Sequence, residues 1–178
     1  IAAWRSLGKP SLPTMIYGIL AGLVAISASA AWVTLPAAAV IGAIAGILVF
    51  SSIGLMDRLR IDDPVGTVSV HLTCGIWGTL AVGLFAVGPS STVKALYKVG
   101  PSTGLMLGGG FSQLVPQLVG ILAVGVFTAL GSTLAWWIIK VLAGLRVPEE
   151  EELRGLDLSE HNMEAYSGFA KETLDMEI

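Results

Sequence analysis

Three long stretches of the chain contain no charged residue, and they constrain the fold more than any other feature. Asp, Glu, Lys and Arg are absent from residues 11–56, 64–93 and 99–139. A helix needs about 20 apolar residues to cross the hydrocarbon core of a bilayer, because its backbone polar groups must be satisfied within the segment. The three stretches meet this requirement. They predict an all-α fold, a polytopic bundle of transmembrane helices.

The first stretch is too long for one span and breaks naturally around Trp32 and Pro36. The second begins at Pro64, which suits the first turn of a helix, and ends at Gly88-Pro89. The third starts with a polar, glycine-rich lead and continues as an apolar run. Four spans are therefore predicted within a transmembrane region of residues 1–147, at about residues 12–31, 37–56, 65–87 and 113–143.

The composition agrees with a membrane protein and excludes other classes. Hydrophobic residues make up 54% of the chain and charged residues 13%, against roughly 25% charged residues in an average soluble domain. No basic patch is present, so a nucleic-acid partner is not expected. A single cysteine, Cys74, excludes an intrachain disulfide framework and a multi-cysteine zinc site. We expect no metal and no cofactor, and we expect membrane lipid as a partner.

Charges outside the spans predict the orientation. The N-terminal segment, the 57–64 loop and the end of the last span up to residue 147 carry six Lys and Arg, whereas the opposite side carries only Lys94 and Lys98. Positive charge favours the cytoplasmic side, so both ends are predicted to lie in the cytoplasm and the spans in the plasma (inner) membrane. Residues 148–178 hold ten acids and two bases and are interpreted as a cytoplasmic tail. Since residue 1 is Ile, we expect a C-terminal piece of a longer protein.

Small residues recur within the predicted spans at separations of three or four. The best instances are Gly18 with Gly22 and Gly42 with Gly46. Lipid gives little hydrophobic drive between helices, so small residues that let two backbones approach closely contribute much of the packing. The pattern predicts a tightly packed bundle with these glycines at helix contacts.

His71 is the only histidine within any predicted span, and Lys140, near the end of the last span, is the only charged residue in one. His71 lies seven positions after Pro64, about 10 Å along a helix that rises 1.5 Å per residue. One interpretation is a neutral imidazole that bonds a neighbouring helix. The other is functional, because imidazole donates at one nitrogen and accepts at the other without becoming charged. Such a group stabilises a small polar solute or relays a proton inside a membrane.

Two carboxylates, Asp62 and Asp63, stand directly before Pro64. Their spacing favours a structural role over acid–base chemistry. Asp63 fits an N-cap followed by a first-turn proline, and both carboxylates suit the positive end of the helix dipole. We predict that they fix where the helix starts and so set the depth of His71.

Three blocks of residues, in the same order, resemble the ammonium transporter (Amt/Mep/Rh) family. Asp62-Asp63-Pro64, His71, Cys74-Gly75-Ile76, Gly78 and Gly83-Leu84-Phe85 are similar to the family's tenth helix. Lys9-Pro10-Ser11 and residues 18–24 resemble the entry and body of its eighth helix. Residues 144–150, Gly155-Leu156-Asp157, His161 and Glu164-Ala165-Tyr166 resemble its cytoplasmic C-terminal region, in the form found in the bacterial and plant Amt branch.

The resemblance implies an eleven-helix fold of two inverted repeats that assembles as a homotrimer with one pore in each subunit. This chain would supply helices eight to eleven, part of the second repeat, and the tail. Ammonium loses its proton at a hydrophobic pore lined by a histidine pair, of which His71 matches the second member. Leu20 matches an aliphatic pore-lining position. The tail residues Gly155, Asp157, His161 and Tyr166 would belong to a regulatory segment, and a PII signalling protein is a possible cytoplasmic partner.

Two other functions compete with transport. An ammonium sensor would couple the same module to a signalling output domain, and the length of the full gene would distinguish the two. An intramembrane enzyme would need a nucleophile or metal beside His71, and the nearby Ser69, Thr73 and Cys74 form no recognisable constellation with it. Transport is the favoured interpretation, and the chain is not expected to be an enzyme.

Overall fold

The structure is a computed structural model that describes residues 1–9, 11–88 and 100–165. Pro10, Pro89, Lys94, Lys98 and Tyr166, which enter the predictions above, lie outside these ranges. The described residues form helices and turns, and their extended pairing is confined to one isolated bridge between Val87 and Thr103. The predicted all-α fold is therefore confirmed. The chain divides into two compact units, Ile1–Val126 and Phe127–Ile178, which are described separately.

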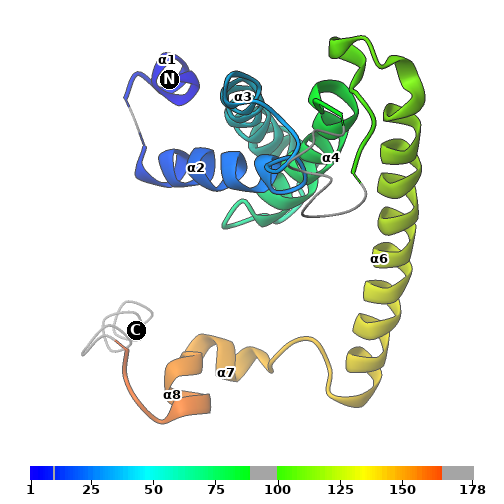
Figure 1. Cartoon of the computed structure of the whole chain (residues 1–178). Coiled ribbons are helices and arrows are strands. Elements are labelled where there is room, and N and C mark those ends of the chain that lie inside the picture. The colour runs from blue at the N-terminus through cyan, green and yellow to red at the C-terminus, as the bar shows by residue number, and fades with distance from the viewer. Residues whose placement is uncertain (10, 89–99, 166–178) are drawn as a thin grey trace. The chain divides into compact units, whose positions relative to one another are not determined.

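The first unit contains the apolar helices of the chain up to the first part of α6 (Figure 1). Three segments are long and apolar enough to cross a membrane, namely Leu35–Leu59, Val68–Phe85 and Gly110–Leu142. A fourth apolar helix, α2, has 16 residues. The elements are α1 (Ala2–Leu7), α2 (Leu12–Ser27), α3 (Leu35–Leu59), the π-helical turn η1 (Val68–Thr73), α4 (Cys74–Phe85), the short 3₁₀ turns η2 (Leu105–Leu107) and η3 (Gly110–Ser112), and α6 (Leu114–Leu142).

The break between α2 and α3 falls where the sequence places it, although α2 ends earlier than the predicted residue 31. The N–H groups of Ser29 and Ala30 both donate to the carbonyl of Ile26, at 3.0 and 2.8 Å, so the chain turns directly after Ser27. At the start of α3, the hydroxyl of Thr34 accepts from the N–H of Ala37 at 3.4 Å. This N-cap, with proline in the first turn, defines a new helix.

The core of the first unit lies where α2, α3 and the η1–α4 segment pack against one another (Figure 1). One face of α3 is buried along its length at spacings of three and four residues, as expected for the contact stripe of a helix. The core residues are Ile41, Ala45 and Val49 from α3, Ala21 and Ala25 from α2, and Val70, Cys74 and Ala81 from the η1–α4 segment.

The close helix contact in this core is made by a different glycine from those predicted. A Cβ added at Gly78 would overlap the backbone of Ala25, with the Ala25 Cα only 2.9 Å away, so α2 and α4 touch backbone to backbone there. At Gly18, Gly22, Gly42 and Gly46 an added Cβ would meet nothing within 4 Å. The expectation that these two pairs make helix contacts is therefore wrong for the described part of the chain. Spacing alone does not say which face of a helix is covered.

The second unit begins inside α6 and continues into the tail. Its two short helices are α7 (Glu149–Arg154) and α8 (Leu156–His161). Gly155 separates them with a φ of 98°, a backbone conformation that residues with a side chain rarely adopt. Glutamates 149–152 are all exposed, as expected of a solvated face. The predicted domain boundary after residue 147 stays a prediction.

The contact at Gly78 predicts a steric effect. Gly78→Ala should lower stability by about 1–3 kcal/mol, because the new methyl group has no space beside the rigid backbone of Ala25. Gly22→Ala, on the other helix of the pair, should cause no loss, since its added methyl group meets open space. Thermal unfolding of the detergent-solubilised protein, followed by circular dichroism, measures both. Equal melting temperatures for the two variants would contradict the close contact.

Candidate functional site

His71 lies on η1, a turn of π helix that leads directly into α4. π-Helical turns inside α-helices are rare and occur frequently at functional sites. The two residues before the imidazole differ from it in environment, since Ser69 and Val70 are buried and His71 is exposed. No hydrogen bond or ion pair joins the imidazole to any part of the chain that the structure describes. The interpretation of His71 as a neutral imidazole that bonds a neighbouring helix therefore finds no support within these residues.

The other side of the same segment is tied to α3 by polar contacts. The hydroxyls of Thr73 and Ser52 form a hydrogen bond of 2.9 Å. The Cys74 thiol donates to the carbonyl of Ala45 at 3.6 Å. One turn further along, the indole N–H of Trp77 donates to the carbonyl of Ile41 at 3.1 Å. These contacts fix the η1–α4 segment against α3 while His71 stays on an uncovered face.

Leu20, the other predicted pore residue, lies on α2 and is 41% exposed. α2 contacts η1, so the two predicted pore residues come from neighbouring elements of one unit. Both side chains are exposed within the described part of the chain.

Asp63 caps the start of the helix from further away than predicted. Its two carboxylate oxygens accept from the N–H groups of Val68 and Ser69, both at 3.0 Å. Pro64 belongs to a turn and not to the first helical turn, because the Gly66 N–H donates to the Asp63 carbonyl at 3.1 Å and Gly66 has a φ of 66°. The helix therefore begins at residue 68, and His71 lies three residues into it instead of seven after its start.

The two neighbouring carboxylates differ in environment. Partial burial raises the pKa of Asp63, but the backbone N–H groups of Ser69 and Val68 favour the charged form, and the net effect lowers its pKa below the usual value. Asp62 is exposed and accepts no hydrogen bond from the described residues. The capping role therefore belongs to Asp63 alone.

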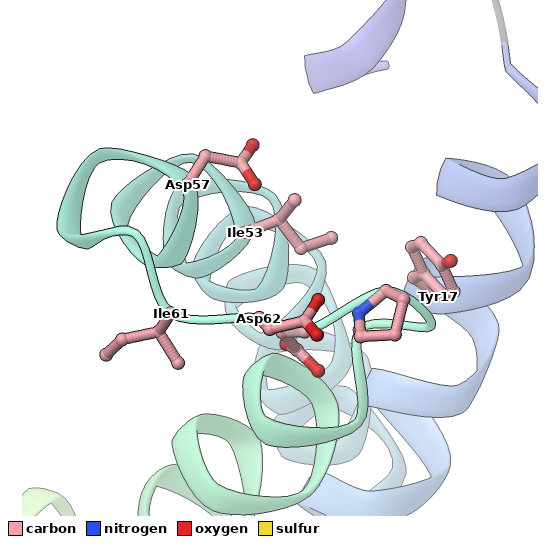
Figure 2. Close-up of a pocket in the computed structure, with 8 residues that line it drawn as sticks. Tyr17, Ile53, Asp57, Ile61 and Asp62 are labelled. Carbon is pink, nitrogen blue, oxygen red and sulfur yellow. The ribbon is translucent and has the colours of Figure 1, made fainter. Parts of the chain in front are cut away.

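A cavity of about 250 Å³ opens beside these carboxylates. Figure 2 shows Tyr17 of α2, Ile53 and Asp57 of α3, and Ile61 and Asp62 of the following loop around it. His71 and Leu20 are not among the residues that line it. The described residues contain no group of three or more His, Cys, Asp and Glu side chains able to hold a metal ion. The cavity is therefore separate from the histidine site.

Of the tail residues predicted to be regulatory, Gly155 directly precedes α8, and Asp157 and His161 lie within it. The Asp157 carboxylate accepts from the N–H of Leu158 at 3.0 Å and from the N–H of Ala165 at 2.9 Å, which closes the chain around the helix. Mainly because of the Ala165 N–H, the pKa of Asp157 is lowered. His161 ends α8 and is exposed. Tyr166 lies outside the described residues.

Ser52 and Trp77 are the contact residues that sequence reasoning missed. The sequence suggests Thr73 only as a possible nucleophile beside His71. A usable signal existed, because polar side chains within apolar spans tend to find partners on neighbouring helices. The sequence does not show which hydroxyls meet.

Comparisons with known proteins agree with the motif blocks. A sequence profile of the Ammonium Transporter Family matches residues 1–166. The chain is 38% identical over 168 residues to ammonium transporter Amt2 of Archaeoglobus fulgidus, covering 93% of this chain and 35% of that protein. It is 38% identical over 159 residues to an ammonium transporter of Mycobacterium bovis, covering 89% and 33%. Ammonium transporter Amt1 of Haloferax mediterranei is 36% identical over 169 residues, covering 93% and 29%.

The chain belongs to the Ammonium Transporter Family, and the predicted resemblance is confirmed. Family membership and the long apolar helices make it an integral membrane protein. The relatives are named as transporters and not as enzymes. The chain spans about a third of the length of these relatives.

The cap predicts a pH-dependent contribution to stability. Asp63→Asn should destabilise the protein by about 1–3 kcal/mol at neutral pH, because the amide is uncharged and places an NH2 group where the second carboxylate oxygen accepts an N–H. Since the pKa is lowered on folding, this contribution is present above the ordinary pKa of Asp and is lost as the pH falls through the lowered value. Unfolding measured at neutral pH and in acid should show the variant and parent converging in acid. Asp62→Asn is the matched control, and an equal effect from it would contradict the assignment.

The tail makes a separate prediction. Asp157→Ala should speed amide hydrogen exchange at Leu158 and Ala165 several-fold, because both N–H groups lose their carboxylate acceptor. Glu160→Ala, an exposed acid on the same helix, should leave those two amides unchanged. Hydrogen exchange at these two amides, measured by mass spectrometry, tests the prediction. Equal protection in the Asp157 variant and the parent would show that the carboxylate does not hold this turn.

Proposed function

We propose that this chain forms part of the subunit of a transmembrane ammonium transporter and supplies one half of its pore site. The observation that carries the proposal is His71, an exposed imidazole on a π turn within a segment that is otherwise uncharged and apolar. Ionisable groups are costly inside a membrane, so one that no neighbouring helix needs for packing marks a pathway. Membership of the Ammonium Transporter Family supports ammonium as the substrate.

The chemistry follows from the cost of desolvation. Ammonium is expensive to remove from water without compensation, whereas ammonia is a small neutral dipole. An imidazole can accept a hydrogen bond from ammonia at one nitrogen and donate one at the other while remaining uncharged. We propose that His71 pairs with a second histidine from a part of the protein outside this chain. Potassium cannot release a proton, so such a site discriminates against it.

Leu20 completes the proposed passage on the side of α2. An aliphatic side chain beside the imidazole keeps water out, which strengthens each hydrogen bond that the imidazole makes. The exposure of Leu20 and the contact between α2 and η1 support this placement.

Assembly and regulation are proposed from the same resemblance. The chain would form helices eight to eleven of an eleven-helix subunit, within the second of two inverted repeats, and three subunits would form a homotrimer. The loop charges support a cytoplasmic C-terminus. The tail, with Gly155, Asp157, His161 and Tyr166, would dock under the subunits and influence transport, and a PII signalling protein would bind from the cytoplasm.

Substitution of the imidazole tests the proposal. His71→Ala in the full-length protein should abolish selective ammonium uptake, and His71→Glu should weaken the discrimination between ammonium and potassium, because a carboxylate stabilises any cation. Flux of both ions into proteoliposomes measures the two effects.

Ile76→Val, a conservative change on the same segment, is the control and should behave like the parent, with equal amounts of each variant in the membrane. Parent-like flux and selectivity in both His71 variants would overturn the assignment of His71. An ammonium sensor would instead bind ammonium in proteoliposomes without measurable flux in the parent protein.

A further inference from the structure

The π turn that carries His71 is held at both ends by hydrogen bonds from side chains. At its beginning, the Asp63 carboxylate accepts from the N–H groups of Val68 and Ser69. At its end, the Thr73 hydroxyl is bonded to the Ser52 hydroxyl of α3 at 2.9 Å. His71 stands between these two points, so the direction of its side chain depends on how this turn is held.

The widened turn changes which residues share a face. In a π helix the backbone bonds run between residues five apart, so Ser69 and Cys74 come to the same side. Both are fully buried, and the Cys74 thiol lies 3.8 Å from the Ser69 carbonyl. In a regular α-helix, residues three and four apart are neighbours, and His71 would lie beside Cys74 toward α3. The π turn therefore directs the imidazole away from α3, where it is exposed.

Ser52 is suited to hold this arrangement. It ends the buried stripe of α3, and its side chain is only 6% exposed. The other buried residues of that stripe, Ile41, Ala45 and Val49, offer no polar side-chain atom. A buried hydroxyl without a hydrogen-bond partner destabilises the folded state, so the bond between Ser52 and Thr73 favours the arrangement in which the two hydroxyls meet.

We infer that Ser52 and Thr73 are positioning residues, whose hydrogen bond fixes the π turn and thereby the direction in which His71 points. The inference rests on the proposed function for its consequence, because a misdirected imidazole matters only where it contacts the substrate. Its geometric content is independent of transport and is tested separately.

The test uses Thr73→Val, which keeps the shape of the side chain and removes its hydroxyl. Thr79→Val is the matched control, because the Thr79 hydroxyl donates only to the Gly75 carbonyl of its own helix, at 2.9 Å. On α3, Ser52→Ala has its control in Ser51→Ala, whose hydroxyl donates to the Ile47 carbonyl of the same helix at 3.0 Å. Thr73→Ser, unlike Thr73→Val, keeps the hydroxyl and removes only the methyl group. All variants are made in the full-length protein with and without His71→Cys.

The first readout is the rate at which a water-soluble thiol reagent labels His71→Cys, corrected for labelling of the protein that lacks this substitution. Thr73→Val and Ser52→Ala should each change the rate by about threefold, the size expected from one interhelical hydrogen bond in a membrane. The double variant should change it no further, since both substitutions remove the same bond. Thr73→Ser should restore the parent rate. Rates equal to those of the Thr79 and Ser51 controls would overturn the inference.

The second readout is ammonium flux and its selectivity over potassium, measured without His71→Cys. We expect both to fall in Thr73→Val and Ser52→Ala and to recover in Thr73→Ser, with unchanged amounts of protein in the membrane. If Thr73→Val and Ser52→Ala change the labelling rate of His71→Cys but His71→Ala has parent-like flux, the proposed function is overturned and the positioning role stands. If Thr73→Val and Ser52→Ala leave the labelling rate unchanged but His71→Ala loses flux, the positioning role is overturned and the proposed function stands.

Discussion

The seam between α3 and the η1–α4 segment is the interaction on which the rest of the first unit depends. Lipid tails are as apolar as the helices, so burial of apolar surface contributes little to their association, and close packing with interhelical hydrogen bonds has to hold them together. The seam supplies both. Buried apolar residues line α3, while hydroxyl, thiol and indole groups of the facing segment each find an oxygen on α3. The neighbouring α2 packs against both elements and touches the backbone of α4 at Gly78.

The seam also gives meaning to the exposure of His71. A polar side chain in a membrane helix ordinarily finds a partner on the next helix, and Trp77 does so with the carbonyl of Ile41 at 3.1 Å. His71 belongs to the same segment, yet the described residues offer it no hydrogen bond and leave it uncovered. Trp77 therefore contributes to helix packing, whereas the His71 imidazole is left exposed for a ligand or for a residue outside the described part of the chain.

Charge distribution made the helical fold and its spans predictable, because an uncharged run of this length has few alternatives in any solvent. The break between α2 and α3 was visible in Trp32 and Pro36, but the π turn was not, since the usual reading of helical periodicity assumes 3.6 residues per turn. Asp63 was expected directly before the helix. The left-handed Gly66 instead closes a turn in between, a conformation that the spacing of polar and apolar residues does not reveal.

This displaced start joins the cap and the imidazole into one structural unit. With the helix beginning at Val68, His71 lies about 4.5 Å along it at 1.5 Å per residue, within the same turn whose first N–H groups the Asp63 carboxylate binds. A site deep in a long helix would be insulated from events at its end. A site in the first turn is not, because the Asp63 carboxylate binds backbone N–H groups of the same widened turn that carries the imidazole. The selectivity proposed for His71 therefore depends on how firmly the helix start is held.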